Sequence, residues 1–326
     1  MIVAPSDRSG GPGGYAFRVG FFVMVGHSHT RSHSHTHDDH DWAARLEHLR
    51  RTDEVEIAAR QDVADRLLSG LRTGATVVDV GSGAGGMAAR LGLALRSRGG
   101  GTVVLVDAVP ELLDAATEHV RSVLGDGSTG EVEVRAVLAD ATDDALPGHV
   151  RAADLVWASR VVHHLRDQQD GIHRLAKLLA PGGTLALAEG GLGTKCVPWD
   201  LGIGRPGLVD RMIAARAAWF VDMRSSIPDA VRMNAGWTSA LANAGLSAVT
   251  SFSYLVDHPA PVSDRIRAAA VEWFTFMAEM SSDRLDEDDR AAIERLLDPN
   301  GAVYIGARDD LFYLHCDTVH LGHRPK

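Results

Sequence analysis

The sequence has little cysteine, few aromatic residues and no excess of basic residues, and these absences exclude several classes of protein. Two cysteines in 326 residues, Cys196 and Cys316, cannot form the disulfide framework of a small secreted domain, so we expect a reducing, cytoplasmic location. Acidic residues outnumber basic ones by 43 to 33, giving a net charge of −10. A nonspecific nucleic-acid binder would need a basic face, so we expect no nucleic-acid partner.

Long apolar runs are also missing. The strongest candidate for a membrane segment, residues 15–26, is too short to span a bilayer and contains Arg18. It also has no convincing cleavage site for a signal peptide. We therefore predict no membrane partner. Met24 lies inside this stretch, and the sequence fits initiation at Met24 as well as at Met1.

Residues 1–41 are low in complexity, rich first in glycine and then in histidine. Such a segment cannot build a hydrophobic core, so we predict a disordered tail. Histidine tracts bind transition metals through imidazole, but the spacing here is irregular and no cysteine accompanies it. We favour a solvated tail with adventitious metal affinity and predict no metal site. The alternative, a metal-handling protein, requires that removal of residues 1–41 abolishes activity.

After the tail, short apolar runs alternate with helical patterns. The runs that predict strands are residues 76–80, 102–106, 132–138, 154–158 and 184–188. The patterns that predict helices between them include residues 86–98, 110–124 and 168–179. This alternation predicts an α/β fold with a doubly wound, mostly parallel sheet. Because parallel strands end at one edge of a sheet, Gly81, Asp107, Asp140 and Ser159 should lie along that edge.

Helical segments flank this pattern on both sides. Residues 42–75 predict an N-terminal helical lid, in which Asp53 and Glu56 resemble a capping arrangement. Residues 76–326 would form the main domain, with helical caps at about 200–235 and 260–300. Within it, residues 190–206 are expected to be a loop. The later elements that the sequence predicts are helices at 207–225, 236–244, 261–280 and 286–297 and strands at 247–256 and about 310–321.

The most informative segment is residues 77–86, VVDVGSGAGG, in which an apolar run ends in an acid and a glycine-rich turn. The pattern G-x-G-x-x-G, typical of dinucleotide binding, would use Gly81, Gly83 and Gly86. The pattern D-x-G-x-G-x-G would use Asp79, Gly81, Gly83 and Gly85. Asp79 favours the second pattern, because a carboxylate is unfavourable beside a pyrophosphate but suits a cationic ligand.

The second pattern resembles motif I of the class I S-adenosylmethionine (SAM)-dependent methyltransferases. Two further segments resemble the small-molecule members of that family: the VVHHL segment at 161–165 and LLAPGGTLALAE at 178–189. The resemblance covers roughly residues 55–255, with a last strand near 311–322. It implies a seven-stranded Rossmann-like sheet, closed by an antiparallel seventh strand beside the sixth, with S-adenosyl-L-methionine as cofactor.

The resemblance also implies roles for individual residues. Asp79, with the glycines, would line the methionine end of the cofactor, Asp107 would hold the ribose, and Asp140 would border the adenine. Arg160 departs from the small or polar residue expected at its position and could pair with a carboxylate. The cofactor-binding set implied in this way is Asp79, Gly81, Ser82, Gly83, Gly85, Asp107, Ala108, Asp140, Ala141, Ser159 and Arg160.

Two adjacent histidines are the candidates for a general base. His163 and His164 follow the fourth strand, and a histidine near its ordinary pKa can accept a proton from a hydroxyl, phenol or amine. The alternative is that either one only packs or caps a helix. Glu189 ends the fifth strand and could touch substrate or serve the structure.

These observations predict a SAM-dependent methyltransferase that acts on a small molecule. O-Methylation of a secondary-metabolite-like acceptor is the first choice, with N- and C-methylation open. One alternative is a SAM- or S-adenosylhomocysteine-binding protein that does not methylate, either regulatory or cyclase-like. The other is an NAD(P)-dependent oxidoreductase. The predicted partner is a small-molecule acceptor, and a homodimer is compatible with the sequence.

Overall fold

The computed structural model describes residues 46–125, 130–150 and 152–326. All of them belong to one compact unit, His33–Lys326. The predicted disordered tail and the first residues of the predicted lid lie outside the described residues. Within the described part of the chain, none of the helices combines the length and apolarity needed to cross a bilayer.

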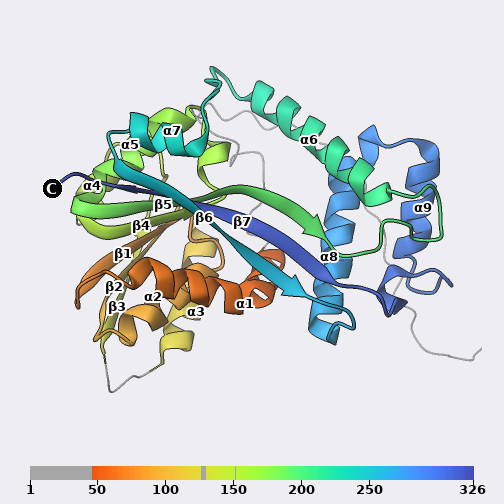
Figure 1. The fold of residues 1–326 in the computed structure, drawn as a ribbon, viewed down its shortest axis with the longest axis horizontal. Coiled ribbons are helices and arrows are strands. Elements are labelled where there is room, and N and C mark those ends of the chain that lie inside the picture. The colour runs from red at the N-terminus through yellow and green to blue at the C-terminus, as the bar shows by residue number, and fades with distance from the viewer. Residues whose placement is uncertain (1–45, 126–129, 151) are drawn as a thin grey trace, which may run out of the picture. The chain divides into compact units, whose positions relative to one another are not determined.

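The described residues form a seven-stranded sheet in the order β3-β2-β1-β4-β5-β7-β6 (Figure 1). The strands are β1 (Ala75–Val80), β2 (Gly101–Asp107), β3 (Val132–Leu138), β4 (Ala153–Ser159), β5 (Leu179–Lys195), β6 (Ser247–His258) and β7 (Tyr313–His323). β7 lies between β5 and β6 and runs antiparallel to both. The predicted mostly parallel sheet, with its antiparallel last strand beside the sixth, is confirmed.

Helices cover both faces of the sheet. The α-helices are α1 (Leu46–Leu68), α2 (Gly86–Arg96), α3 (Pro110–Leu124), α4 (Leu146–His149), α5 (Gln168–Lys177), α6 (Leu208–Ser226), α7 (Trp237–Asn243), α8 (Asp264–Ser281) and α9 (Glu287–Leu297). Short 3-10 turns are η3 (Val162–His164), η4 (Ser282–Arg284) and η5 (Ile305–Ala307). Helices α1, α2 and α3 pack on one face, and α4, α5 and α7 on the other.

The buried residues of the strands explain this layering. Neighbouring residues of a strand point to opposite faces, so Val77 joins the core under α1, α2 and α3, and Val78 joins the core under α5 and α7. β1 pairs with β2 on one side and with β4 on the other, and the strand order reverses between them. In sheets of this kind the crevice beyond the carboxyl ends of such a strand pair is the usual ligand site.

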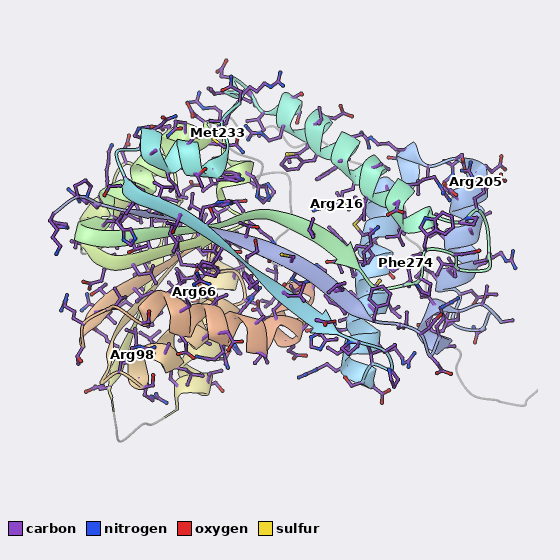
Figure 2. The ribbon with its side chains drawn as sticks, in the orientation of Figure 1. Arg66, Arg98, Arg205, Arg216, Met233 and Phe274 are labelled. Carbon is purple, nitrogen blue, oxygen red and sulfur yellow. The ribbon has the colours of Figure 1, made fainter. Side chains whose placement is uncertain are left out.

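A third core lies at the far ends of the long strands (Figure 1). Helices α6, α8 and α9 enclose Phe274, which is fully buried, together with Cys196 directly after β5 and Tyr313 from the start of β7. Figure 2 labels Phe274 on α8, beside α9. These helices lie within the two segments expected as caps, at about 200–235 and 260–300, and their capping role stays a prediction.

The strand β5 differs from its expected form at both ends. It begins at Leu179, which pairs with Ala153, and not at the expected residue 184, so the Pro-Gly-Gly segment lies inside the strand as an irregularity. It also continues to Lys195, where the sequence predicts a loop. The glycines there signal a loop locally, but antiparallel pairing of Leu192 with Cys316 holds the segment extended. Long-range pairing has overridden local preference.

The expected capping arrangement at Asp53 and Glu56 is also wrong. Both residues lie inside α1, seven and ten residues beyond Leu46, the first residue that the structure describes in this helix. Their side chains instead contact other elements of the fold. The remaining predicted elements are present, with ends that differ by a few residues.

Candidate functional site

The glycine-rich turn after β1 requires glycine at several positions. Gly81, Gly83 and Gly85 have φ values of +70°, +54° and +87°. A Cβ on Gly81 would lie 2.4 Å from Cγ2 of Val161, and one on Gly85 would lie 2.9 Å from the backbone of Ala116. Larger residues are therefore excluded by both conformation and space. The predicted motif forms a tight cradle of backbone between β1 and α2.

Asp107, at the end of β2, fixes this cradle. Its Oδ2 accepts a hydrogen bond from the Gly83 N–H at 2.9 Å, and its Oδ1 accepts one from the Val109 N–H at 3.0 Å. Burial raises the pKa of Asp107. Ser82 lies in the same turn, and its hydroxyl is buried without a hydrogen-bond partner among the described residues. A buried hydroxyl in a glycine cradle fits a site that receives a polar ligand.

Asp79 is the buried acid that precedes the cradle, with 3 % of its surface exposed. Burial raises its pKa to about 7, and the neighbouring carboxylates Asp53 and Asp107 act in the same direction. The Arg60 guanidinium opposes them. A carboxyl group in this state is ready to ionise when a cation binds beside it. This fits the ammonium and sulfonium groups of the expected cofactor.

The first turn of α2 already holds an anion. Asp53 of α1 accepts a hydrogen bond from the Gly86 N–H at 2.9 Å. A Cβ on Gly86 would lie 2.2 Å from Asp53 Cγ, which explains why glycine is needed there. The N-terminus of a helix after such a turn is where dinucleotide-binding proteins hold a pyrophosphate. With the Asp53 carboxylate in that place, the geometry favours the D-x-G-x-G-x-G pattern over G-x-G-x-x-G.

The other expected cofactor residues lie at the same edge of the sheet. In the strand registers, Val80 is aligned with Val106 and with Ala158, so β1, β2 and β4 end together. Asp140 accepts hydrogen bonds from the Thr142 N–H and hydroxyl, each at 2.7 Å, and its charge acts on Asp107. Ala108 is exposed directly after β2, and Ala141 and Ser159 are half-buried.

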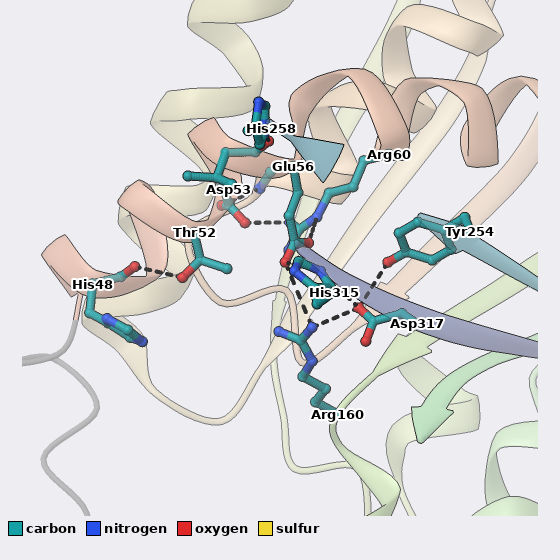
Figure 3. Close-up of polar contacts among 12 residues, drawn as sticks. His48, Thr52, Asp53, Glu56, Arg60, Arg160, Tyr254, His258, His315 and Asp317 are labelled. Atoms are coloured by element: carbon teal, nitrogen blue, oxygen red, sulfur yellow. Dashed lines mark hydrogen bonds and ion pairs between the residues drawn. The ribbon is translucent and has the colours of Figure 1, made fainter. Parts of the chain in front are cut away.

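Arg160, whose side chain is partly exposed, pairs with buried carboxylates in an ion-pair network that the sequence did not reveal (Figure 3). Its Nη2 lies 2.6 Å from Asp317 Oδ2 and 3.7 Å from Glu56 Oε1. Tyr254 donates its hydroxyl to Asp317 at 3.1 Å, and Arg60 donates to Glu56 at 2.7 Å. The Arg160 guanidinium is therefore held by carboxylates of the chain, from α1 and β7, and is taken up by this network.

The same network contains a cluster with the composition of a metal site. Donor atoms of Glu56, His315 and Asp317 lie within 4.8 Å of one another. However, the Arg160 guanidinium lies between the two carboxylates and supplies the positive charge that a metal ion would bring. Burial alone would raise the pKa of Glu56, but the charges of Arg60 and Arg160 outweigh it and hold that pKa well below its usual range. We therefore describe the cluster as an ion-pair network.

His163 is held by a buried carboxylate. Its Nδ1 lies 2.7 Å from Glu189 Oε2, and Glu189 Oε1 accepts the Val162 N–H at 2.8 Å. Glu189 is 2 % exposed, whereas a quarter of the His163 side chain is exposed. A carboxylate on Nδ1 favours the tautomer in which Nε2 is free to accept a proton. The ring of His164 packs against His163 with the ring centroids 4.1 Å apart.

One cavity borders the glycine cradle and is lined by residues of α1, α2 and α3. Its lining residues include Asp53, Arg60, Gly86, Arg90 and His119. Neither Asp107 nor His163 belongs to this lining. It nevertheless borders the cofactor motif, because Ala84 and Gly86 of the glycine-rich turn belong to its lining.

Comparisons with known proteins agree with this geometry. Residues 78–185, which run from β1 into β5, match the family model described as a methyltransferase domain. The chain is 27 % identical over 148 residues to the ubiquinone/menaquinone biosynthesis C-methyltransferase UbiE of Enterobacter sp. (strain 638). The aligned region covers 41 % of this chain and 55 % of that protein. It is 30 % identical over 155 residues to the 27-O-demethylrifamycin SV methyltransferase of Amycolatopsis mediterranei (strain S699), covering 46 % of this chain and 53 % of the relative.

The chain thus spans about half the length of these curated relatives. Among solved structures, phosphoethanolamine N-methyltransferase 2 of Haemonchus contortus, in complex with S-adenosyl-L-methionine, is 16 % identical. That match covers 82 % of this chain and 52 % of the other, with a TM-score of 0.41. The motif, the sheet order and the family match lead to one conclusion: the chain contains a methyltransferase domain of the class I SAM-dependent family, whose cofactor is S-adenosyl-L-methionine.

Proposed function

We propose that this protein transfers a methyl group from SAM to a hydroxyl of a small molecule, with His163 as the general base. The observation that carries the proposal is the His163–Glu189 pair, in which a buried carboxylate orients a partly exposed imidazole. The two curated relatives support the small-molecule class, because their names describe a C-methyltransferase of quinone biosynthesis and a methyltransferase of a rifamycin.

The location of the pair supports this role. Val161 packs directly on Gly81 of the cradle, and the Val162 N–H is bound by Glu189. His163 therefore lies two residues after Val161, the residue that contacts the cofactor motif. Its ring also faces Phe220 of α6, with the centroids 5.6 Å apart, so that an acceptor between α6 and the cradle would lie beside the imidazole.

The chemistry asked of the chain is limited. When bound, SAM supplies an activated methyl group, so the protein mainly provides alignment, exclusion of water and a place for one proton. As the acceptor oxygen takes up the methyl group that SAM would supply, the proton of the acceptor hydroxyl would pass to Nε2 of His163. Glu189 stabilises the imidazolium that results.

For the cofactor, we propose the residues that meet at the edge of the sheet. Asp79 and the cradle would hold the methionine end, Asp107 the ribose, and Asp140 and Ala141 the adenine, with Ala108 and Ser159 adjacent. Arg160 would contribute indirectly, through its ion pairs with Glu56 and Asp317. Helix α1 would cover the cofactor, because Leu49 approaches Gly83.

The first experiment is calorimetric titration of the protein with SAM, S-adenosylhomocysteine and NADH, followed by a screen of hydroxylated acceptors for methylation. We expect both adenosyl ligands to bind and NADH not to bind. In the screen, His163→Ala should lower kcat by about 10²- to 10⁴-fold at unchanged SAM affinity. The matched variant His164→Ala should keep most of the activity.

Three results would oppose the proposal. Binding of NADH without SAM would contradict the cofactor. Full kcat in His163→Ala would remove this histidine from the chemistry. Tight SAM binding without methylation of any acceptor would favour a cofactor-binding protein that does not methylate.

A further inference from the structure

Helix α6 lies against the segment that carries His163. Arg216, Phe220 and Arg224 are four residues apart and share one face of the helix. Arg224 donates to the carbonyl oxygens of His163 and Leu165, and Phe220 meets the His163 ring. This face of α6 is therefore turned toward the proposed catalytic segment, and Arg216 lies one helical turn from Phe220 on the same face.

Arg216 has no acidic partner within the part of the chain that the structure describes. Neighbouring arginines do: Arg160 pairs with Asp317, and Arg211 pairs with Asp289. The charge that acts on Arg216 is that of Arg160, which is also positive. The surrounding protein and this repulsion both lower the pKa of Arg216. A cation placed beside another cation, without a counter-charge, destabilises the ligand-free site.

The surroundings of Arg216 are aromatic and open to solvent. Its guanidinium carbon lies 5.9 Å from the ring centroid of Phe276 on α8. The ring of His48, on α1, stacks on the same Phe276 ring, with the two ring centroids 5.3 Å apart. The Arg216 side chain remains exposed, so a ligand can reach it. Figure 2 shows Arg216 between α6 and the long strands β5 and β7.

We propose that Arg216 binds a carboxylate of the methyl acceptor, and that the acceptor is a ring-containing hydroxy acid. This inference rests on the proposed function. The hydroxyl would face Nε2 of His163, the ring would lie against Phe220, and the carboxylate would reach Arg216. A planar guanidinium binds a carboxylate through two parallel hydrogen bonds.

The test uses the full chain loaded with S-adenosylhomocysteine and two probes of similar shape, 4-hydroxybenzoate with a carboxylate and 4-hydroxybenzamide with a neutral carboxamide. Calorimetry should show the benzoate binding about tenfold tighter or more, because only it carries the carboxylate. Added NaCl should reduce this preference. In Arg216→Gln the preference should disappear while the affinity for S-adenosylhomocysteine stays unchanged.

Arg265→Gln is the matched control, because Arg265 is an exposed arginine on the neighbouring helix α8. It should keep the preference for the benzoate. Equal binding of the two probes, absence of benzoate binding, or a preference that survives Arg216→Gln would overturn the anionic acceptor and leave the proposed methyltransferase standing. Failure of S-adenosylhomocysteine itself to bind would instead overturn the proposed function.

Discussion

Asp79 combines deep burial with the task of receiving a cation. In the folded, ligand-free protein, burial raises its pKa to about 7, whereas in the unfolded chain it ionises near its ordinary value. The group therefore stabilises the ligand-free fold less as the pH rises from about 4 to about 7. A cofactor with an ammonium group would recover this loss by binding the ionised form.

The first prediction concerns the pH dependence of SAM binding. Below pH 7 the Asp79 proton must be released before the cation binds, so affinity should rise with pH by up to about tenfold per unit and level off above pH 7. Calorimetry between pH 5.5 and 8.5 measures this. Asp79→Asn should bind more weakly with a flat profile, and without ligand it should melt at a higher temperature at pH 8. A flat profile in the unaltered protein would contradict the assignment.

A second prediction separates the orienting role of Glu189 from binding. Glu189→Gln keeps the shape of the side chain but removes the charge that stabilises the His163 imidazolium. We expect kcat to fall by about 10- to 100-fold with little change in SAM affinity. Steady-state kinetics on an acceptor found in the screen measure kcat, and calorimetry measures the affinity for SAM. An unchanged kcat would show that the pair only holds the structure.

How far single residues can be predicted depends on where their partners lie in the chain. Asp79 and the cradle glycines belong to one short motif, so the pattern identifies them. The partner of Arg160 is Asp317, which is 157 residues away, and nothing near either residue indicates the pairing. Glu189 and His163 were both candidates, but only the pairing of β4 with β5 places them together.

At the scale of elements, α1 acts as a cap for another helix. Asp53, in the middle of α1, accepts the Gly86 N–H at the start of α2 and also pairs with Arg60. A carboxylate at a helix N-terminus offsets the positive end of the helix dipole. α1 is thus tied to the cofactor motif by a polar contact as well as by the core residues Val63 and Leu68.

The third prediction tests this contact. Asp53→Ala removes the acceptor for the Gly86 N–H and should lower the free energy of unfolding by about 0.5–2 kcal/mol. For a chain of this size the melting temperature should fall by a few degrees, measured by thermal denaturation. Asp53→Asn retains an acceptor oxygen and should lose less. Equal stability of Asp53→Ala and the parent protein would show that the contact contributes little.

The elements themselves were predictable where they are simple. Central parallel strands are buried on both faces, so β1, β2 and β4 appear as continuous apolar runs. The end of β5 does not appear as an apolar run, because its glycines fit a loop pattern. Only the pairing with β7 keeps this segment extended. The false cap at Asp53 has a similar origin, since the true partner of the carboxylate is on another helix.

At the scale of the whole described unit, the hydrophobic residues form three cores, one on each face of the sheet and one among the cap helices. The cap core contains no residue of β1, β2 or β4, the strands whose ends form the proposed cofactor site. Its link to that site is Val55 of α1, so damage to this core should affect cofactor binding only through α1.

The fourth prediction follows from this separation. Phe274 is fully buried, and Phe274→Ala should lower the free energy of unfolding of the cap core by about 3–5 kcal/mol. SAM affinity, measured by calorimetry, should change little, whereas methylation should fall because α6 loses its support on α8. A comparable substitution in the sheet core, Leu105→Ala, should weaken SAM binding as well. Loss of SAM binding in Phe274→Ala would argue against independent cores.

The strands β5 and β7 run from the sheet to the cap core and pair along most of this length, with register shifts between Ala188 and Gly191 and between Leu192 and Lys195. A pair of bonded strands resists bending far more than a single connecting loop does. The cap helices are therefore joined to the sheet by two paired strands, and we expect this connection to resist opening of the whole cap as a hinged lid. We then expect acceptor and product to enter and leave when a single helix, α1 or α6, moves aside. The rate of that movement would limit turnover.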